Sequence, residues 1–277
     1  MRKIDRILLA VVFIAVFWRL ADQTLFSVQP DTLRTPLVIH TTLDVARQNI
    51  PAVLKDSPIA PSTNKPNSYY TGSAFALSRD GHWMTATHVA DNCKRIEILH
   101  ETGKARFKHI PVKGWRKLEG LDIAILDTAK GQPGLNVART LSERGDLGFF
   151  FGYPKGVASA GYAAHLGRSR MIRAGGRVRE TGDVWSIYEM APRKEIHLGG
   201  NSGGPMMNAV GEVVGVVSAG SDRRGRVITS IVPGLTPVKS FSKPEHQRRA
   251  KLTPSNYIAY GEQLRRQGLV TKVSCRT

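Results

Sequence analysis

Residues 197–218 read HLGGNSGGPMMNAVGEVVGVVS, and four glycines of this stretch surround one serine, Ser202. A glycine costs a strand about 0.5–1 kcal/mol relative to alanine, so this cluster indicates a backbone that other residues do not adopt easily. A serine hydroxyl becomes a useful nucleophile when a base takes its proton, and the oxyanion that follows needs donors already in place. The stretch therefore favours a nucleophilic Ser202, with the N–H groups of Gly200 and Ser202 as an oxyanion hole. A plain glycine-rich turn is the alternative.

A nucleophilic serine needs a base and an acid that orients the base. His88 follows small residues in MTATHVADNC and is the candidate base, although a single histidine is most often an ordinary core or surface residue. Asp122 opens the apolar run DIAILD, and a buried acid is rare unless it is paired. Asp127, at the other end of that run, is predicted to be a solvated strand end.

Short apolar or alternating runs favour an all-β body. They are TGSAFALS, HWMTATH, RIEIL and DIAILD, followed after residue 146 by GDLGFFFGYP, YAAHLGRSRMI, DVWSIYEM, GEVVGVVSAG and RVITSIVP. Two such groups of strands predict two small barrels or sandwiches in tandem. Near the C-terminus, TPSNYIAYGEQLRRQGLV predicts a helix that Thr253 or Ser255 caps and Gly268 ends.

Three motifs resemble those of chymotrypsin-fold serine proteases, most closely of their HtrA/Deg branch: TGSAFALSRDGHWMTATHV, LDIAILDT and GGNSGGPMMNAVGEVVGV. The segment GYPKGVASAGYAAHLGRSR is also similar to a segment of that branch, and the resemblance covers about residues 69–232. Histidine, aspartate and serine occur in the order of the chymotrypsin fold. The resemblance implies two six-stranded barrels with the site between them, His88 as general base, Asp122 as orienting acid and Ser202 as nucleophile.

The predicted fold class is thus all-β: two tandem six-stranded chymotrypsin-like β-barrels, a C-terminal α-helix and an N-terminal hydrophobic segment. The expected boundaries are 1–26 for a signal peptide or anchor, 27–68 for a linker with a short helix over Leu43–Asn49, 69–240 for the protease domain, divided near 130–145, and 241–277 for a C-terminal extension with the helix.

The sequence departs from the family pattern at three points. Asn201 replaces the acid that pairs with a newly cut N-terminus in digestive trypsins, which argues against activation of that kind. About 45 residues follow Pro233, too few for the PDZ domain typical of HtrA proteins. Residues 191–200 read APRKEIHLGG instead of an I-N-P-G type run, which leaves open whether the resting loop is active or collapsed.

The resemblance also implies where substrate specificity resides. In chymotrypsin-like proteases, the residue six positions before the nucleophile lies at the base of the primary specificity pocket, and here it is Ile196. An apolar base gives a Lys or Arg side chain no partner for its charge. The sequence therefore predicts cleavage after small or medium apolar residues, and VVSAG resembles one pocket wall, with Ser218, Ala219 and Gly220. A count shifted by one would place Glu195 or His197 at the base.

The N-terminus predicts export. Three basic residues, Arg2, Lys3 and Arg6, precede the apolar run Ile7–Trp18, which is the layout of a secretory signal or a signal anchor. No clear A-x-A cleavage site follows. We therefore expect the segment 7–25 to be retained in the cytoplasmic membrane, with the body periplasmic or otherwise extracytoplasmic.

Cysteine content and charge give weaker indications. In an exported protein Cys93 and Cys275 are a possible disulfide, but the sequence does not place them near each other. No Cys or His pair has zinc-ligand spacing, and no cofactor is expected. The formal net charge of +18 attracts polyanions, yet the arginines are scattered and no nucleic-acid-binding motif accompanies them, so no specific nucleic-acid partner is predicted.

The sequence thus predicts an exported serine endopeptidase that acts on protein or peptide substrates through an acyl-enzyme. A catalytically inactive, protease-like binding module is the alternative from another class. An esterase using the same residues is a third possibility. The G-x-S-x-G pattern of α/β-hydrolases would hint at it, but the surrounding strands and the His-Asp-Ser order here point elsewhere.

Overall fold

The computed structural model describes residues 57–59, 68–103, 106–173, 179–192, 196–235, 238 and 251–277. Contacts divide the chain into two units, Met1–Val45 and Ala46–Thr277, and all described residues belong to the second. The hydrophobic segment 7–25 and the helix expected over Leu43–Asn49 lie outside the described residues. Within the described part, no helix is long and apolar enough to cross a membrane.

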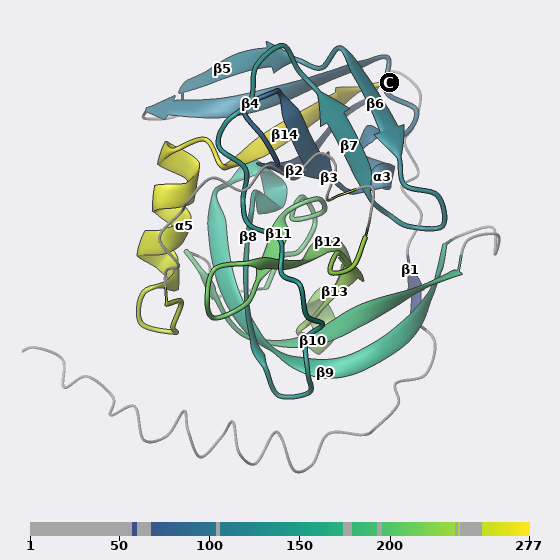
Figure 1. Cartoon of the computed structure of the whole chain (residues 1–277), viewed down its shortest axis with the longest axis vertical. Coiled ribbons are helices and arrows are strands. Elements are labelled where there is room, and N and C mark those ends of the chain that lie inside the picture. The colour runs from purple at the N-terminus through teal and green to yellow at the C-terminus, as the bar shows by residue number, and fades with distance from the viewer. Residues whose placement is uncertain are drawn as a thin grey trace, which may run out of the picture. The chain divides into compact units, whose positions relative to one another are not determined.

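Two mostly antiparallel sheets form the body, and we call them the first sheet and the second sheet (Figure 1). The first sheet contains β2 (Tyr69–Ala76), β3 (His82–Thr85), β4 (Arg95–Gly103), β5 (Arg106–Pro111), β6 (Gly114–Lys117), β7 (Ala124–Asp127) and β14 (Val270–Arg276). The second sheet contains β1 (Ser57–Ile59), β8 (Leu147–Gly152), β9 (Ser159–Arg173), β10 (Arg179–Ala191), β11 (Pro205–Met207), β12 (Val213–Ser221) and β13 (Arg226–Ile231). The helices are α3 (Thr87–Ala90), α5 (Tyr257–Arg266) and the short 3₁₀ turns η1 (Pro154–Gly156) and η2 (Asp222–Arg224).

The second sheet closes into a barrel. Its strand order is β1-β9-β10-β13-β12-β11-β8, and the additional pairing of β9 with β8 joins six strands into a ring. The strand β1 pairs in parallel with β9 at the edge of the sheet, the position in which a strand tolerates a proline such as Pro58. This strand lies within the predicted linker, where the turn-rich composition concealed it.

The first sheet is a half-barrel with the order β5-β4-β14-β2-β3-β7-β6. The strands β5 and β6 are at opposite ends of this order, since β5 pairs with β4 and β6 pairs with β7. Only two residues separate β5 from β6 in the chain, so the sheet must curve to bring its two ends together. The predicted all-β, chymotrypsin-like fold with two barrels is therefore confirmed, with one barrel closed and the other half closed.

The C-terminal part contributes a helix and a central strand. The predicted helix is present as α5, and Gly268, at φ +67°, follows its end as expected. The predicted caps are wrong: the N-cap is Asn256, and the hydroxyls of Thr253 and Ser255 hydrogen-bond to each other. The sequence analysis missed β14, which pairs with both β2 and β4.

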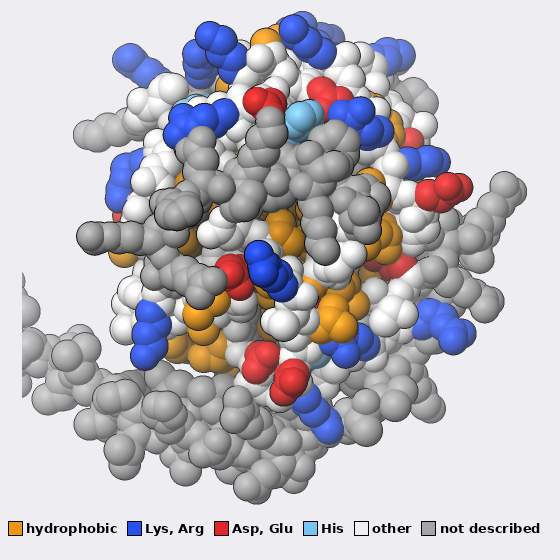
Figure 2. Space-filling model, viewed as in Figure 1, with side chains coloured by type: hydrophobic (Ala, Val, Ile, Leu, Met, Phe, Trp, Pro, Cys, Tyr) orange, Lys and Arg blue, Asp and Glu red, His pale blue; other side chains and the backbone are white. Residues whose placement is uncertain are grey.

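Buried side chains hold the two sheets and α5 together. The larger cluster combines Phe75 of the first sheet, Phe151 of the second and Leu264 of α5, all of them buried. A second cluster fills the closed barrel around Trp185. On the surface, Lys and Arg side chains are spread over the visible face and lie among acidic ones, rather than gathered in a single field (Figure 2).

Candidate active site

His88 lies on α3, directly after β3, and Asp122 lies directly before β7. Because β3 and β7 pair with Thr85 opposite Ala124, the two residues meet at the same end of the first sheet. His88 Nδ1 is 2.7 Å from Asp122 Oδ2, and the backbone N–H of His88 donates to Asp122 Oδ1 at 3.1 Å. Asp122 is fully buried. A buried carboxylate bonded to Nδ1 orients an imidazole and leaves Nε2 for a proton.

Asp127, at the other end of the same strand, is different. Its carboxylate accepts hydrogen bonds from Arg116 Nη2 at 2.8 and 3.0 Å, and its side chain is 31% exposed. This agrees with the prediction of a solvated strand end, and it leaves Asp122 as the partner of His88.

The close contacts of Gly203 with two neighbouring strands fix the loop that carries Ser202. Gly203 has φ +88°, and a Cβ there would lie 2.1 Å from Ser73 O and 2.2 Å from Thr85 Oγ1. Ser73 N donates to Ser202 O at 2.8 Å, and Gly203 N donates to Val217 O at 2.7 Å. The loop is therefore clamped between β2, the end of β3 that leads to His88, and β12. Such close approach requires glycine.

The side chain of Ser202 is half-buried in this loop. Its Oγ makes no hydrogen bond to any residue that the structure describes. Nucleophile–base hydrogen bonds are often long in structures without substrate.

The carbonyl groups of Gly199 and Gly200 are hydrogen-bonded to other segments of the chain. Gly199 O accepts a hydrogen bond from Lys155 N at 2.7 Å, and Gly200 O accepts one from Ser73 Oγ at 2.8 Å. Gly200 has φ +102°, and a Cβ there would lie 2.5 Å from Tyr153 O. In the described part of the chain, the N–H groups of Gly200 and Ser202 donate to no acceptor. Both therefore remain available for an oxyanion.

The hydroxyl of Ser73 stabilises the loop that carries Ser202. It donates to Gly200 O and accepts from Tyr153 N at 3.0 Å. Burial, followed by the nearby Glu101 carboxylate, raises the pKa of the Tyr153 phenol, which stays protonated and reaches Glu101 Oε2 at 3.5 Å. The sequence analysis identified the strand that contains Ser73 but not this role.

The predicted pocket residues have different surroundings. Ser218 is buried, and its hydroxyl donates to Asp122 Oδ2, so it contacts the acid rather than only lining a wall. Ala219 is half-buried and Gly220 is exposed. Ile196 is partly buried against the cluster inside the closed barrel.

Leu198, which the sequence did not single out, packs against the predicted pocket wall. A Cβ on Gly220 would lie 2.3 Å from Leu198 Cδ1, so these two residues touch where the pocket wall was predicted. His197, one of the alternative base residues, has Nδ1 3.7 Å from Asp222 Oδ2. Glu195 lies outside the described residues.

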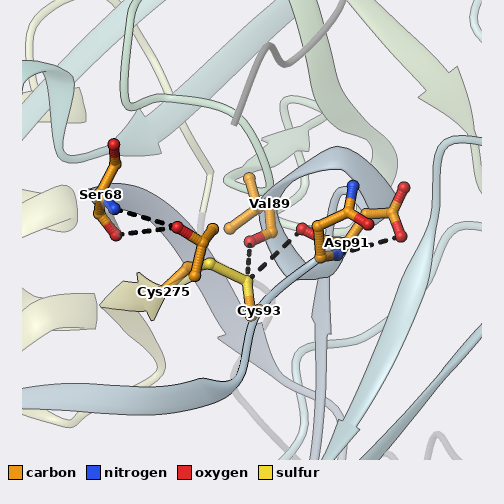
Figure 3. Close-up of a disulfide and its surroundings, with 7 residues drawn as sticks. Ser68, Val89, Asp91, Cys93 and Cys275 are labelled. Carbon is orange, nitrogen blue, oxygen red and sulfur yellow. Dashed lines mark hydrogen bonds between the residues drawn. A yellow bond between two sulfur atoms is a disulfide. The ribbon is translucent and has the colours of Figure 1, made fainter. Parts of the chain in front are cut away.

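A disulfide ties the histidine segment to β14. The structure joins Cys93, three residues after α3, to Cys275, with a Cα–Cα distance of 5.5 Å (Figure 3). Beside it, Ser68 N donates to Thr277 Oγ1 at 3.0 Å, and Thr277 N donates to Ser68 O at 3.2 Å. The sequence left this pairing open because β14 itself was not identified.

Two cavities of the structure lie away from the candidate active site. These cavities, of about 820 and 770 Å³, lie beside Arg265 and beside Arg168, and His88, Asp122 and Ser202 line neither. Among the described residues, no group of three or more His, Cys, Asp or Glu side chains could hold a metal ion.

Known proteins share this sequence pattern and fold. A family model described as a trypsin-like peptidase domain matches residues 72–216, just over half of the chain. The uncharacterised protein y4bJ of Sinorhizobium fredii is 29% identical over 185 residues, which cover 66% of this chain and 27% of that protein. Serine protease HTRA1B of Danio rerio is 28% identical over 243 residues, which cover 83% of this chain and 46% of that protein.

Among solved structures, the active form of the Rv3671c protease from M. tuberculosis superimposes with a TM-score of 0.51. It is 19% identical, and the match covers 73% of this chain and 96% of that one, which supports the fold. The chain spans less than half the length of the curated relatives that it matches. On its motifs, its barrels and its matched family model, the chain belongs to the trypsin-like peptidase domain family, with relatives in the HtrA branch.

Proposed function

We propose that this protein is an exported serine endopeptidase with His88, Asp122 and Ser202 as its catalytic triad. The observation that carries the proposal is the 2.7 Å contact between His88 Nδ1 and the buried Asp122, at the end of the sheet against which the Ser202 loop is clamped. Membership of a protease family agrees with it. The inactive-module alternative is not favoured, because none of the three side chains is substituted.

The proposed reaction uses these groups in two steps. His88 Nε2 takes the proton of Ser202 Oγ as the hydroxyl attacks the peptide carbonyl, and the N–H groups of Gly200 and Ser202 bind the resulting oxyanion. His88 then gives this proton to the leaving amine, which leaves an acyl-enzyme on Ser202. Water, activated by His88, hydrolyses the ester. Asp122, held by the Ser218 hydroxyl, stabilises the imidazolium in both steps.

Labelling with a fluorophosphonate tests the proposal most directly. We expect stoichiometric phosphonylation of Ser202, located by peptide mass spectrometry, because the reaction needs the base and the oxyanion hole together. Ser202→Ala should abolish both labelling and casein hydrolysis, and His88→Ala should reduce them to a similar level. A Ser202→Ala variant that still cleaves casein would exclude Ser202 as the nucleophile. Hydrolysis of p-nitrophenyl esters without any peptide cleavage would favour the esterase alternative.

Export and membrane attachment are part of the same proposal. Their support is the apolar run Ile7–Trp18 behind three basic residues. We expect the mature protein to keep residues 7–25 and to sediment with membranes, with its body on the outer side. N-terminal sequencing that finds a mature start between residues 22 and 31 would show that the segment is cleaved.

A further inference from the structure

A second buried carboxylate contacts the predicted catalytic acid. Glu180, on β10, is 6% exposed, and its Oε2 accepts a hydrogen bond from the backbone N–H of Asp122 at 2.5 Å. Its Oε1 accepts one from Ser230 Oγ, also at 2.5 Å. Glu180 and Ser230 belong to neighbouring strands of the second sheet, whereas Asp122 belongs to the first. The contact therefore crosses from one sheet to the other.

The other hydrogen bonds of Asp122 show which groups the Glu180 contact helps to position. The carbonyl of Asp122 accepts from Thr87 N at 3.3 Å, and Thr87 precedes His88 on α3. The Asp122 carboxylate is hydrogen-bonded to His88 Nδ1 and also accepts a hydrogen bond from the hydroxyl of Ser218 on β12. With Glu180 on its N–H, the second sheet holds Asp122 at two separate points, the carboxylate and the backbone.

The energetics indicate a specific role for Glu180. A carboxylate removed from water costs several kcal/mol unless hydrogen bonds replace its hydration. The replacement here includes the peptide N–H of a residue whose position determines the imidazole orientation. Catalytic groups must be held closely, and a displacement of about 1 Å can cost about 100-fold in rate.

We propose that Glu180 is a positioning residue for this catalytic triad. From the second sheet, which supports the Ser202 loop through β12, it fixes the backbone of Asp122 and thereby the direction of His88 toward Ser202. This inference rests on the proposed function, because it assigns Glu180 a role in the same reaction. Glu180 acts on the reaction through its contact with Asp122.

Three variants separate positioning from general stability. Glu180→Ala removes both hydrogen bonds, and we expect kcat per active site to fall about 10–100-fold with KM nearly unchanged. Glu180→Gln can accept from Asp122 N–H with its amide oxygen and donate to Ser230 Oγ with its NH₂, so it should restore most of kcat. Asp183→Ala is the matched control: Asp183 lies on the same strand, is 1% exposed, and binds His165 Nε2 at 2.9 Å and Arg168 Nε at 3.2 Å. It should lower the melting temperature but leave kcat per active site unchanged.

Active sites are counted by the end-point of fluorophosphonate labelling, so that unfolded molecules do not enter kcat. On an Asp122→Ala background, adding Glu180→Ala should reduce kcat no further, because Glu180 acts through Asp122. The proposal is overturned if Glu180→Ala retains the wild-type kcat per labelled site, if Asp183→Ala lowers kcat equally, or if Glu180→Gln is as impaired as Glu180→Ala. Failure of the wild-type protein to label at Ser202 would instead overturn the proposed function.

Discussion

At the residue scale, Gly203 shows how much of the candidate site depends on a missing side chain. The space for its Cβ is filled by a backbone carbonyl of β2 and a hydroxyl of β3, and its φ is in the left-handed region. Gly199, four residues earlier, has nothing within 4 Å of its Cβ position and no left-handed φ. The two glycines therefore have different functions although the sequence alone does not distinguish them.

This difference gives a first prediction. Gly203→Ala should push the Ser202 loop away from β2 and reduce peptidase activity at least about 100-fold, since displacements of about 1 Å have that effect. Gly199→Ala should retain most of the activity and the same melting temperature. Initial rates on a casein substrate, normalised to folded protein by circular dichroism, compare the two. Equal activity of both variants would contradict the clamp.

A second prediction concerns specificity. Ile196, Leu198 and Gly220 carry no charge, and the nearby Asp222 carboxylate already accepts from Leu198 N at 3.1 Å and lies 3.7 Å from His197 Nδ1. A cationic substrate side chain buried against the three uncharged residues would lose its hydration at a cost of several kcal/mol. We expect cuts after Val, Ala, Ile or Leu in a peptide library mapped by mass spectrometry. A majority of cuts after Lys or Arg would show that another residue, such as Glu195, forms the base.

The sequence was enough to nominate His88, Asp122 and Ser202, which the structure brings to one end of the first sheet, because nucleophilic chemistry restricts residue type and the glycine pattern around a serine is local. Glu180 and Leu198 were not predictable in this way. Their contacts join segments far apart in the sequence, and nothing in RETGDVW indicates that its glutamate reaches the N–H of Asp122. Ser218 was placed in the right strand but assigned to the wall, since its rotamer toward Asp122 is a tertiary feature.

At the element scale, the contact of α5 with β4 depends on one histidine. His100 of β4 packs against the end of α5, where a Cβ on Gly268 would lie 2.7 Å from the imidazole. Burial, reinforced by the Lys108 charge, lowers the pKa of His100 from its usual 6.5, although a backbone contact with Arg266 and the Glu101 charge act in the opposite direction. The folded protein therefore favours the neutral imidazole.

This shift makes a third prediction. Below pH 6.5 the unfolded chain binds a proton at His100 more readily than the folded protein, so this residue's contribution to stability is present at higher pH and is lost on acidification. The melting temperature should fall between pH 7.5 and 5.5, and less steeply in His100→Asn. Parallel slopes for both proteins would show that His100 does not contribute. Other titrating groups affect the wild type and His100→Asn alike, so the difference between the two slopes reports on His100.

At the scale of the whole molecule, the described structure is closed by contacts between residues far apart in the sequence. The disulfide joins positions separated by 182 residues, and Ser68 and Thr277 pair beside it. The sequence predicted the two barrels because alternating strands and turns are local signals. It did not predict β14, since VTKVSCR becomes a strand through its partners β2 and β4.

A fourth prediction follows from this closure. In the chain-entropy description, a cross-link over 182 residues stabilises the folded state by up to about 5 kcal/mol. Cys93→Ser combined with Cys275→Ser should lower the urea midpoint accordingly, and dithiothreitol should lower that of the wild type to a similar value. Dithiothreitol should have no effect on the double variant. Unchanged midpoints in all cases would show that the bond does not constrain the unfolded chain.

The place of β14 also governs when, during biosynthesis, this protein becomes competent. On a ribosome, β2, His88, Asp122 and Ser202 all emerge before residues 270–276, so β2 and β4 wait for the strand that lies between them. Because Ser73 of β2 holds the Ser202 loop, a nascent chain that already contains His88, Asp122 and Ser202 still lacks a supported candidate site. Stalled chains ending before residue 270 should resist fluorophosphonate, whereas chains extended beyond residue 277 and allowed to fold should react. Under the proposed function, this strand order would delay proteolytic competence until after Ser202 has been synthesised and would protect the growing chain from premature cleavage.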